Sequence, residues 1–192
     1  MNEEANLNIQ LVLDEPRAFT GFKARLVNFT NVRNYLALVG PECKELDGIL
    51  GYYGEQLVLL AQSLGLNSCW VGGTFKVVNR AYNVDLGQKL AAVVALGYGA
   101  TQGVPHRSKA PQEVAPGYDG APEWFKRGVD AALLAPTALN QQKFSFSLDG
   151  EENDVPVVRA STKRGAFTQM DLGIAQCHFE IGAGNALYRW AE

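Results

Sequence analysis

The sequence predicts an α+β fold for a single domain that spans residues 1–192. One observation is a pair of long segments with helical spacing of apolar residues, Leu46–Gly65 and Thr168–Gly182. Another is the order of the elements, because in each half of the chain two short strand-like segments precede the long helix. The third is size, since 192 residues with 47% hydrophobic content are enough for one core.

In the first half, strands are predicted at Leu7–Leu13, Asn34–Val39 and Lys89–Tyr98. The first alternates, whereas Asn34–Val39 is apolar throughout and is expected at the centre of a sheet. The long helix is predicted to end in a glycine C-cap at Gly65. A short helix is predicted at Val77–Tyr82.

Glycine recurs at every third position in the first turns of the long helix, as Gly48, Gly51 and Gly54. Glycine costs about 1 kcal/mol against alanine inside a helix, so these residues predict close approach by another backbone or by a flat ligand. The chain then runs through Trp70 and Val71 into Gly72 and Gly73, where main-chain N–H groups could face a ligand. The alternative is a core helix followed by an ordinary glycine turn.

The second half begins after a connector at residues 110–120. A helix is predicted at Pro122–Ala135, followed by strands at Phe144–Leu148 and Val155–Ala160 with an acidic loop between them. The long helix at Thr168–Gly182 follows these strands. The residues predicted to face inward are Phe125, Val129, Ala132 and Leu133 in the helix at Pro122–Ala135, and Met170, Ile174, Cys177 and Ile181 in the helix at Thr168–Gly182. The two halves, roughly 1–110 and 121–192, form a faint internal repeat.

Composition argues against several classes of function. The net charge of −3, the pI near 5.5 and the lack of a basic run disfavour nucleic acid or an anionic membrane as partner. No apolar stretch reaches the roughly 18 residues of a membrane span, and the first residues do not resemble a signal peptide. Three cysteines without CxxC spacing suggest reduced thiols and a cytoplasmic protein. Neither a metal site nor a catalytic triad is predicted.

Two polar segments are candidates for ligand binding. After the helix at Pro122–Ala135 come a hydroxyl and two carboxamides, which can donate and accept hydrogen bonds: Thr137, Asn140 and Gln142. After the strand at Lys89–Tyr98 come Arg107 and Lys109, which suit a phosphate as a fork and as a point charge. The alternatives are a polar helix exit with caps and a solvated basic loop.

Together these segments resemble the nitroreductase family of flavoenzymes. Ala135, Pro136, Asn140 and Gln142 match the family's A-P-S-x-x-N-x-Q-P-W segment, in which Thr137 replaces the serine here. The remaining two positions differ, with Lys143 for proline and Phe144 for tryptophan. The strand followed by Arg107 and Lys109 is similar to the family's strand and K-x-R pair, with the order of the bases reversed. In common members the A-P-S segment precedes the long helix, so the order here resembles a divergent branch of the family.

The resemblance implies a mixed, mostly antiparallel sheet packed by helices around a central pair of long helices. It implies FMN as cofactor, NAD(P)H as co-substrate and a small electron acceptor such as a nitroaromatic or a quinone. The turn formed by Trp70, Val71, Gly72 and Gly73 would meet the flavin N5/O4 edge, and the segment from Pro136 to Gln142 would contact the flavin. The phosphate would be held by Arg107 and Lys109. No catalytic side chain is expected, because the cofactor carries the hydride chemistry.

The resemblance also implies two half-copies in one chain that imitate the usual dimer, with a homodimer possible as well. The family begins with a helix and an R-x-S-x-R segment that this sequence lacks, so we expect an N-terminally truncated chain. The alternative to an enzyme is a catalytically silent protein of the same fold, with or without flavin. A third class is another flavin chemistry, such as reductive dehalogenation or flavin destruction.

Overall fold

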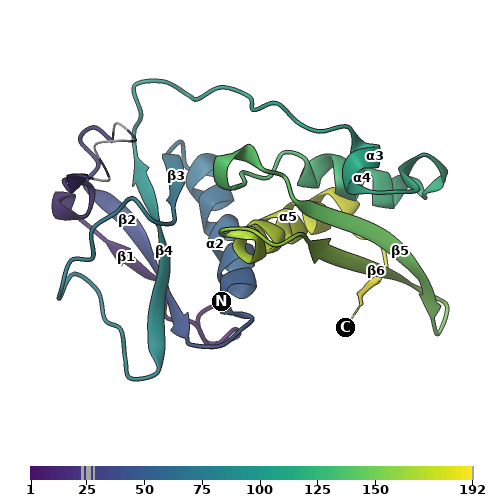
Figure 1. Ribbon diagram of the computed structural model, residues 1–192, viewed down its shortest axis with the longest axis horizontal. Coiled ribbons are helices and arrows are strands. Elements are labelled where there is room, and N and C mark those ends of the chain that lie inside the picture. The colour runs from purple at the N-terminus through teal and green to yellow at the C-terminus, as the bar shows by residue number, and fades with distance from the viewer. Residues whose placement is uncertain (23, 25–26, 28, 192) are drawn as a thin grey trace. The chain divides into compact units, whose positions relative to one another are not determined.

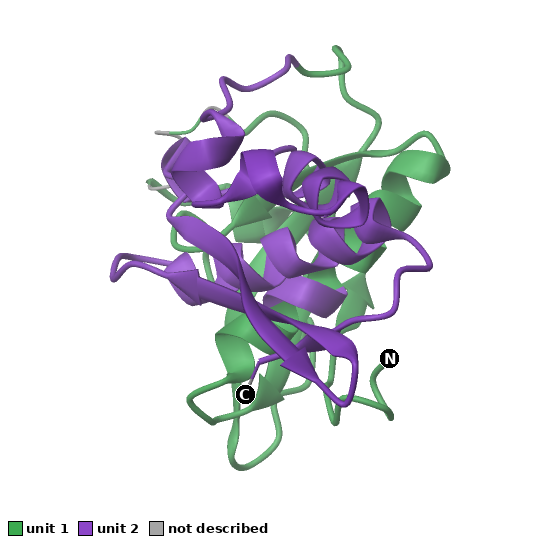
Figure 2. Ribbon diagram, turned by 90° about the vertical axis from the view of Figure 1, so that its right-hand side faces the viewer, with its two compact units in different colours: residues 1–50, 54–103 green, residues 51–53, 104–192 purple. Residues whose placement is uncertain are grey.

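The computed structural model describes residues 1–22, 24, 27 and 29–191, and contains helices and strands as the sequence predicts (Figure 1). The chain divides into two compact units, coloured separately in Figure 2. The first unit comprises residues 1–50 and 54–103, and the second comprises residues 51–53 and 104–192. The prediction of an α+β fold with largely antiparallel strands is confirmed, although the described strands form two sheets rather than one.

The first unit contains an antiparallel sheet of four strands in the order β1-β2-β4-β3. Its elements are β1 (Gln10–Val12), the 3-10 helix η1 (Pro16–Phe19), β2 (Asn34–Pro41), α2 (Leu46–Ser63), β3 (Asn67–Val71) and β4 (Gln88–Gly97). The two apolar strands, β2 and β4, lie side by side in the middle of the sheet. Side chains on both faces of these strands are buried, as their continuous apolar sequences predict. The expectation that the strand at Asn34–Val39 is central is therefore confirmed.

One face of this sheet carries the core of the unit. Alternate residues of β2 and their neighbours form a buried apolar cluster: Val12, Ala18, Phe19, Tyr35, Ala37, Val39, Val71, Val78, Val93 and Ala95. The other face packs against α2, where a Cβ added to Gly54 would lie 2.5 Å from the ring of Trp70 and 3.4 Å from Leu38. Gly54 therefore allows the helix to approach the sheet closely.

The helix α2 ends as its glycine predicts. Gly65 has φ +80°, and its N–H donates to the carbonyl of Gln62 at 3.0 Å. The N–H of Leu66 donates to the carbonyl of Ala61 at 2.9 Å, which completes a Schellman motif. The chain then reverses directly into β3.

The second unit contains β5 (Phe144–Glu152) and β6 (Val155–Thr162), which pair antiparallel, and β7 (Arg189–Trp190), which pairs parallel to β6. Its helical elements are α3 (Pro111–Val114), η2 (Tyr118–Gly120), α4 (Glu123–Ala132), η3 (Ala138–Asn140) and α5 (Thr168–Ala183). The helices α4 and α5 pack tightly, since a Cβ added to Gly182 would lie 2.3 Å from the carbonyl oxygen of Arg127. The aromatic rings of Phe146 and Phe179 stack with centroids 4.7 Å apart in the core.

The middle of α2 belongs to this second unit. A Cβ added to Gly51 would lie 2.2 Å from the carbonyl oxygen of Met170 in α5. The prediction that the helix glycines permit close approach by another backbone is confirmed at this position. Tyr52 donates a short hydrogen bond to Glu180 in the same unit.

Several local predictions are wrong. Val77–Tyr82 is a turn rather than a helix, because Arg80 adopts φ +67°. Ile181 is exposed rather than inward, and Phe179 and Ala183 are buried instead, because Gly182 faces α4. The connector at residues 110–120 contains α3, whose Val114 is fully buried.

The acidic loop predicted before Val155 is shorter than expected. Asp149–Glu152 continue β5, and only Asn153 and Asp154 form the turn, both with positive φ. A two-residue hairpin turn of this kind matches the twist of the strands it joins.

Candidate functional site

The two polar segments lie against each other in the second unit. The backbone carbonyl of Arg107 accepts hydrogen bonds from the side-chain amides of Asn140 and Gln142, both at 2.9 Å. The backbone N–H of Lys109 donates to Oε1 of Gln142 at 2.9 Å, and its ammonium donates to the backbone carbonyl of Gln142 at 2.6 Å. The structure thus brings together Arg107, Lys109, Asn140 and Gln142, which sequence alone places more than thirty residues apart.

Gln142 is the centre of this cluster. Its side chain is 3% exposed and makes three hydrogen bonds to protein groups, the third to Oδ1 of Asn140 at 2.7 Å. Its backbone N–H donates to the hydroxyl of Thr137 at 3.1 Å. Because its amide is buried and already bonded, Gln142 shapes the segment, whereas Pro136 and Asn140 are exposed and Thr137 is half-buried.

The segment from Thr137 to Gln142 is strained. Leu139, Asn140 and Gln142 have φ angles of 54°, 52° and 41°. A left-handed conformation costs a residue other than glycine roughly 1–2 kcal/mol, so hydrogen bonds must hold this loop in shape. Leu139 is fully exposed at its tip, although its side chain is apolar. Strained backbone clusters at ligand-binding and switch segments, so this loop is a candidate for ligand contact.

Asp171, in the first turn of α5, accepts hydrogen bonds from two residues of the loop. Its Oδ1 accepts a hydrogen bond from the backbone N–H of Ala138 at 2.9 Å, and its Oδ2 accepts one from Nε2 of Gln141 at 2.7 Å. The carboxylate is 3% exposed, and burial raises the pKa of Asp171, although the two hydrogen bonds and the charge of Lys143 act in the opposite direction.

The basic segment is attached to the end of α4 as well. Nε2 of His106 donates to the carbonyl of Leu133 at 2.9 Å, and the hydroxyl of Ser108 donates to the same oxygen at 3.2 Å. The last carbonyls of a helix have no partner within the helix, so these side chains satisfy one of them. The guanidinium of Arg107, by contrast, belongs to an exposed residue.

The glycine turn that follows β3 belongs to the first unit. Val71 is buried, Trp70 and Gly72 are half-buried, and Gly73 is exposed. The indole N–H of Trp70 donates to Oε2 of Glu55 at 2.9 Å, and Glu55 itself is 1% exposed on α2. The position of Trp70 is therefore fixed by α2 before the chain enters the turn.

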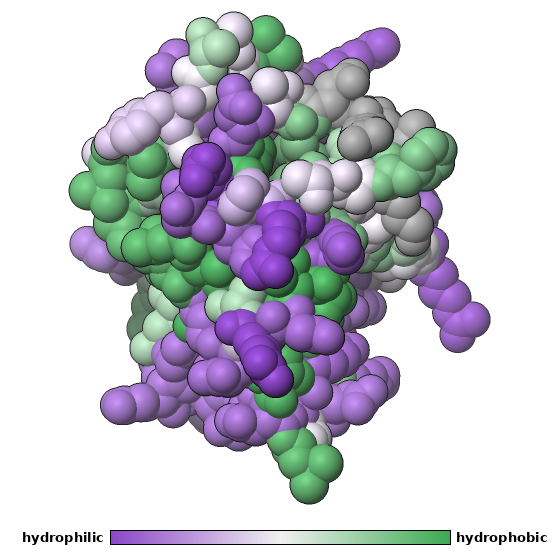
Figure 3. All heavy atoms as spheres, turned by 90° about the vertical axis from the view of Figure 1, so that its left-hand side faces the viewer, coloured by the Kyte–Doolittle hydropathy of each residue, from purple (hydrophilic) through white to green (hydrophobic). Residues whose placement is uncertain are grey.

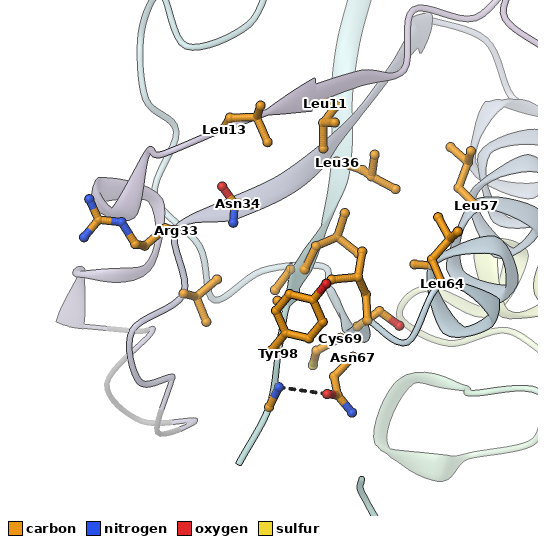
Figure 4. A pocket seen from close by; sticks show the side chains of 18 of the residues that line it. Leu11, Leu13, Arg33, Asn34, Leu36, Leu57, Leu64, Asn67, Cys69 and Tyr98 are labelled. Carbon is orange, nitrogen blue, oxygen red and sulfur yellow. Dashed lines mark hydrogen bonds between the residues drawn. The ribbon is translucent and has the colours of Figure 1, made fainter. Parts of the chain in front are cut away.

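The first unit also carries an apolar groove of about 1290 Å³, between the sheet and the second half of α2. The groove is lined from the sheet side by Leu11, Leu36 and Leu13 just after β1, and from the helix side by Leu57 and the C-cap residue Leu64 (Figure 4). At one end Oδ1 of Asn67 accepts a hydrogen bond from the N–H of Gly99 at 2.8 Å. None of the site residues predicted from sequence lines the groove. Apolar side chains also gather in patches on the face shown in Figure 3.

Two kinds of feature are missing from the part of the chain that the structure describes. No helix there is long and apolar enough to cross a membrane. Within the same residues, no group of three or more histidine, cysteine, aspartate or glutamate side chains is arranged to hold a metal ion.

Comparison with known proteins decides the family. A family model described as "Putative TM nitroreductase" matches residues 1–183. The chain belongs to this nitroreductase family. No curated protein matches this nitroreductase-family chain.

A crystal structure from Thermotoga maritima, of a protein described as a putative nitroreductase, shares the fold of this nitroreductase-family protein with a TM-score of 0.64. The two sequences are 19% identical, and the match covers 92% of this chain. It covers 65% of the Thermotoga chain, so this chain spans slightly less than two thirds of that protein. The family assignment agrees with the resemblance seen in the sequence.

Asp171 and Gln141 belong to the hydrogen-bonded cluster around this loop, and sequence reasoning missed both as candidates. An acid in the first turn of a helix, such as Asp171 in α5, is explained by the helix dipole alone. Gln141 lies within the matched segment but at one of its variable positions. Both residues are polar and lie next to a loop with left-handed φ angles. Sequence could not reveal this role, because the φ angles of the loop are known only from the structure.

Proposed function

We propose that this protein is an FMN-dependent oxidoreductase that uses NAD(P)H to reduce an electron-poor acceptor such as a nitroaromatic or a quinone. The observation that carries the proposal is the strained loop from Thr137 to Gln142 with the basic segment bonded to it. Membership of the nitroreductase family supports the same reaction class.

The groups of this cluster fit the polar parts of FMN. Arg107 offers an exposed guanidinium, which suits a phosphate as a bidentate donor. The ammonium of Lys109 has three donors and gives one of them to Gln142, so it retains donors for an anion. The hydroxyl of Thr137 accepts from Gln142 and can still donate to a ribityl hydroxyl or a ring carbonyl.

When bound, FMN supplies the hydride chemistry between the nicotinamide and the acceptor. Arg107 and Lys109 would hold the phosphate, and the loop around Asn140 would fix the orientation of the ring system. Within the first unit, the backbone N–H groups of Gly72 and Gly73 would suit the N5/O4 edge of a flavin, where such donors stabilise negative charge. No side chain has to transfer a proton or form a covalent bond in this proposal.

The test is a titration of the purified full chain with FMN, followed by visible absorption and flavin fluorescence, and then by NAD(P)H consumption with a nitroaromatic. Arg107→Gln should weaken FMN binding at least tenfold and leave riboflavin binding unchanged, because riboflavin lacks the phosphate. Arg164→Gln, at another exposed arginine, is the matched control and should leave both affinities unchanged.

An alternative function has one observation in its favour. The side chains of Gln142 and Asn140 form hydrogen bonds to other groups of the protein rather than pointing to a ligand. This arrangement suits a catalytically silent protein that keeps the fold. Flavin binding without turnover of any acceptor would favour this alternative. If no flavin band develops even with FMN in large excess, the oxidoreductase proposal is wrong.

A further inference from the structure

The loop from Thr137 to Gln142 needs support from outside itself. Three of its residues adopt left-handed φ angles, and Leu139 exposes its whole side chain to solvent. Neither feature is favourable for an unsupported loop, since such residues return readily to ordinary conformations. On the side of the basic segment, Gln142 provides the support.

On the other side, the support comes from one buried carboxylate. The two oxygens of Asp171 each accept a hydrogen bond, one from Ala138 at the start of η3 and one from Gln141 just after it. Gln141 also donates to the backbone carbonyl of Ala166, at 2.9 Å, in the chain leading into α5. The carboxylate therefore connects both ends of the strained turn to the long helix.

We propose that Asp171 is a positioning residue, whose carboxylate holds the loop around Leu139 and Asn140 in the conformation that receives the flavin. It acts through Ala138 and Gln141 and does not touch the ligand. The inference rests on the proposed function, because it assigns Asp171 to the same flavin site.

The geometry requires a charged carboxylate. Both groups that face Asp171 are donors, a backbone N–H and a side-chain amide N–H, so each oxygen must act as an acceptor. A protonated carboxyl would point a donor at one of these donors and lose that hydrogen bond. Protonation of Asp171 therefore releases one end of the loop.

Several other charges and titratable groups have to be considered beside Asp171. Lys143, at the end of the loop, favours the charged form of Asp171. On the far side of the loop lie His106, Arg107 and Lys109, which are the other titratable or charged groups of the cluster. The FMN phosphate titrates near pH 6, so pH experiments need a variant that keeps all of these groups.

Asp171→Asn is the variant that tests the inference, because it keeps the shape of the side chain and removes one acceptor together with the charge. It should raise the dissociation constant of FMN about tenfold. Asp47→Asn is the matched control, since Asp47 is also an acid in the first turn of a long helix. If Asp171 acted only on the helix dipole, the two variants would behave alike.

The pH profile separates positioning from general stability. For the wild type, the affinity for FMN should fall as the pH drops through the raised pKa of Asp171. The Asp171→Asn protein should lack that component and keep the change due to the FMN phosphate and to groups that both proteins share. Melting temperatures recorded at the same pH values show whether affinity changes without unfolding.

A measurement without ligand completes the test. A protease that cleaves after leucine should cut the wild type slowly at Leu139 and the Asp171→Asn protein at least fivefold faster, because the released loop opens more often. Equal FMN affinity, equal pH profiles and equal cleavage rates for the two proteins would overturn the inference. If the wild type binds no FMN, the proposed function fails, whereas the cleavage rates still decide whether Asp171 holds the loop.

Discussion

Lys109 donates two hydrogen bonds to Gln142. The backbone N–H of Lys109 donates to the side-chain carbonyl of Gln142 at 2.9 Å, and the ammonium of Lys109 donates to the backbone carbonyl of Gln142 at 2.6 Å. Each residue thus uses one backbone and one side-chain group toward the other. The pair fastens the basic segment to the loop, so the phosphate-binding and ring-binding parts of the proposed site form one structure.

Gln142→Glu should break this connection. Nε2 of Gln142 donates to the carbonyl of Arg107 and to Oδ1 of Asn140, and a carboxylate would place a third acceptor against both. A buried side chain that loses two hydrogen bonds and gains charge repulsion should cost about 2–4 kcal/mol of unfolding free energy. Urea denaturation followed by tryptophan fluorescence measures this loss.

Gln169→Glu is the control for that measurement. Gln169 is exposed in the first turn of α5, where a negative charge is compatible with the helix dipole. The change should alter the unfolding free energy by no more than about 0.5 kcal/mol. Similar losses for both variants would show that the buried hydrogen bonds of Gln142 do not hold the segment.

Sequence predicted those parts of the fold where local chemistry decides the structure. Gly65 ends α2 in the expected C-cap, and the apolar run at Asn34–Val39 becomes a central strand. The two strands β3 and β7 were missed, because each depends on a partner elsewhere in the chain. Residues Asn67–Val71 carry mixed polar and apolar side chains, and they form a strand by pairing with β4.

The candidate site shows the same division. The residue types in the segment from Thr137 to Gln142 predicted a polar site, and the motif indicated its family. The sequence could not show that Gln142 is buried or that Asp171 lies beneath the loop, because both facts depend on the left-handed backbone at Leu139. Leucine carries no local signal for that conformation.

Gly51→Ala should destabilise the protein even though alanine is the better helix former. The substitution gains about 1 kcal/mol of helix propensity. Against this, the new Cβ would lie 2.2 Å from the backbone carbonyl oxygen of Met170, which no side-chain rotation can relieve. Overpacking of this kind costs about 1–3 kcal/mol, and the rigid backbone contact favours the upper end, so a net loss is expected in thermal or urea denaturation.

Gly120→Ala is the control for that prediction, since a Cβ at Gly120 meets no atom within 4 Å. It should leave the unfolding free energy within about 0.5 kcal/mol of the wild type. If Gly51→Ala proved equally neutral, the backbones at Gly51 and Met170 would separate more easily than their close contact implies.

The groove of the first unit should bind apolar dyes. Leu60 and Leu64 are 53% and 66% exposed on α2, and both line the groove. Leu60→Lys should lower the fluorescence of added anilinonaphthalene sulfonate severalfold with little change in stability, because it breaks an exposed apolar patch. Leu187→Lys, at a 75% exposed leucine that does not line the groove, should leave the fluorescence unchanged. Equal effects would mean that the dye binds elsewhere.

The unfolding free energy should carry a pH signature of Asp171. Burial raises the pKa of Asp171 in the folded state, so the folded protein holds that proton more tightly than the unfolded chain does. As the pH rises from the ordinary aspartate pKa, about 3.9, through the raised value, the unfolded state loses its proton first and the wild type loses stability. The Asp171→Asn protein has no such component.

The quantity to measure is therefore the difference in unfolding free energy between wild type and Asp171→Asn, from urea denaturation at a series of pH values. It should fall as the pH rises and then level off. Asp149, whose pKa Arg159 lowers, acts in the opposite sense, but it is present in both proteins and cancels in the difference.

A difference that rises with pH would mean that the hydrogen bonds from Ala138 and Gln141 outweigh burial, and that the carboxylate serves stability. A falling difference means that the protein keeps a charged Asp171 at the expense of stability, as expected for a group retained to position a functional loop.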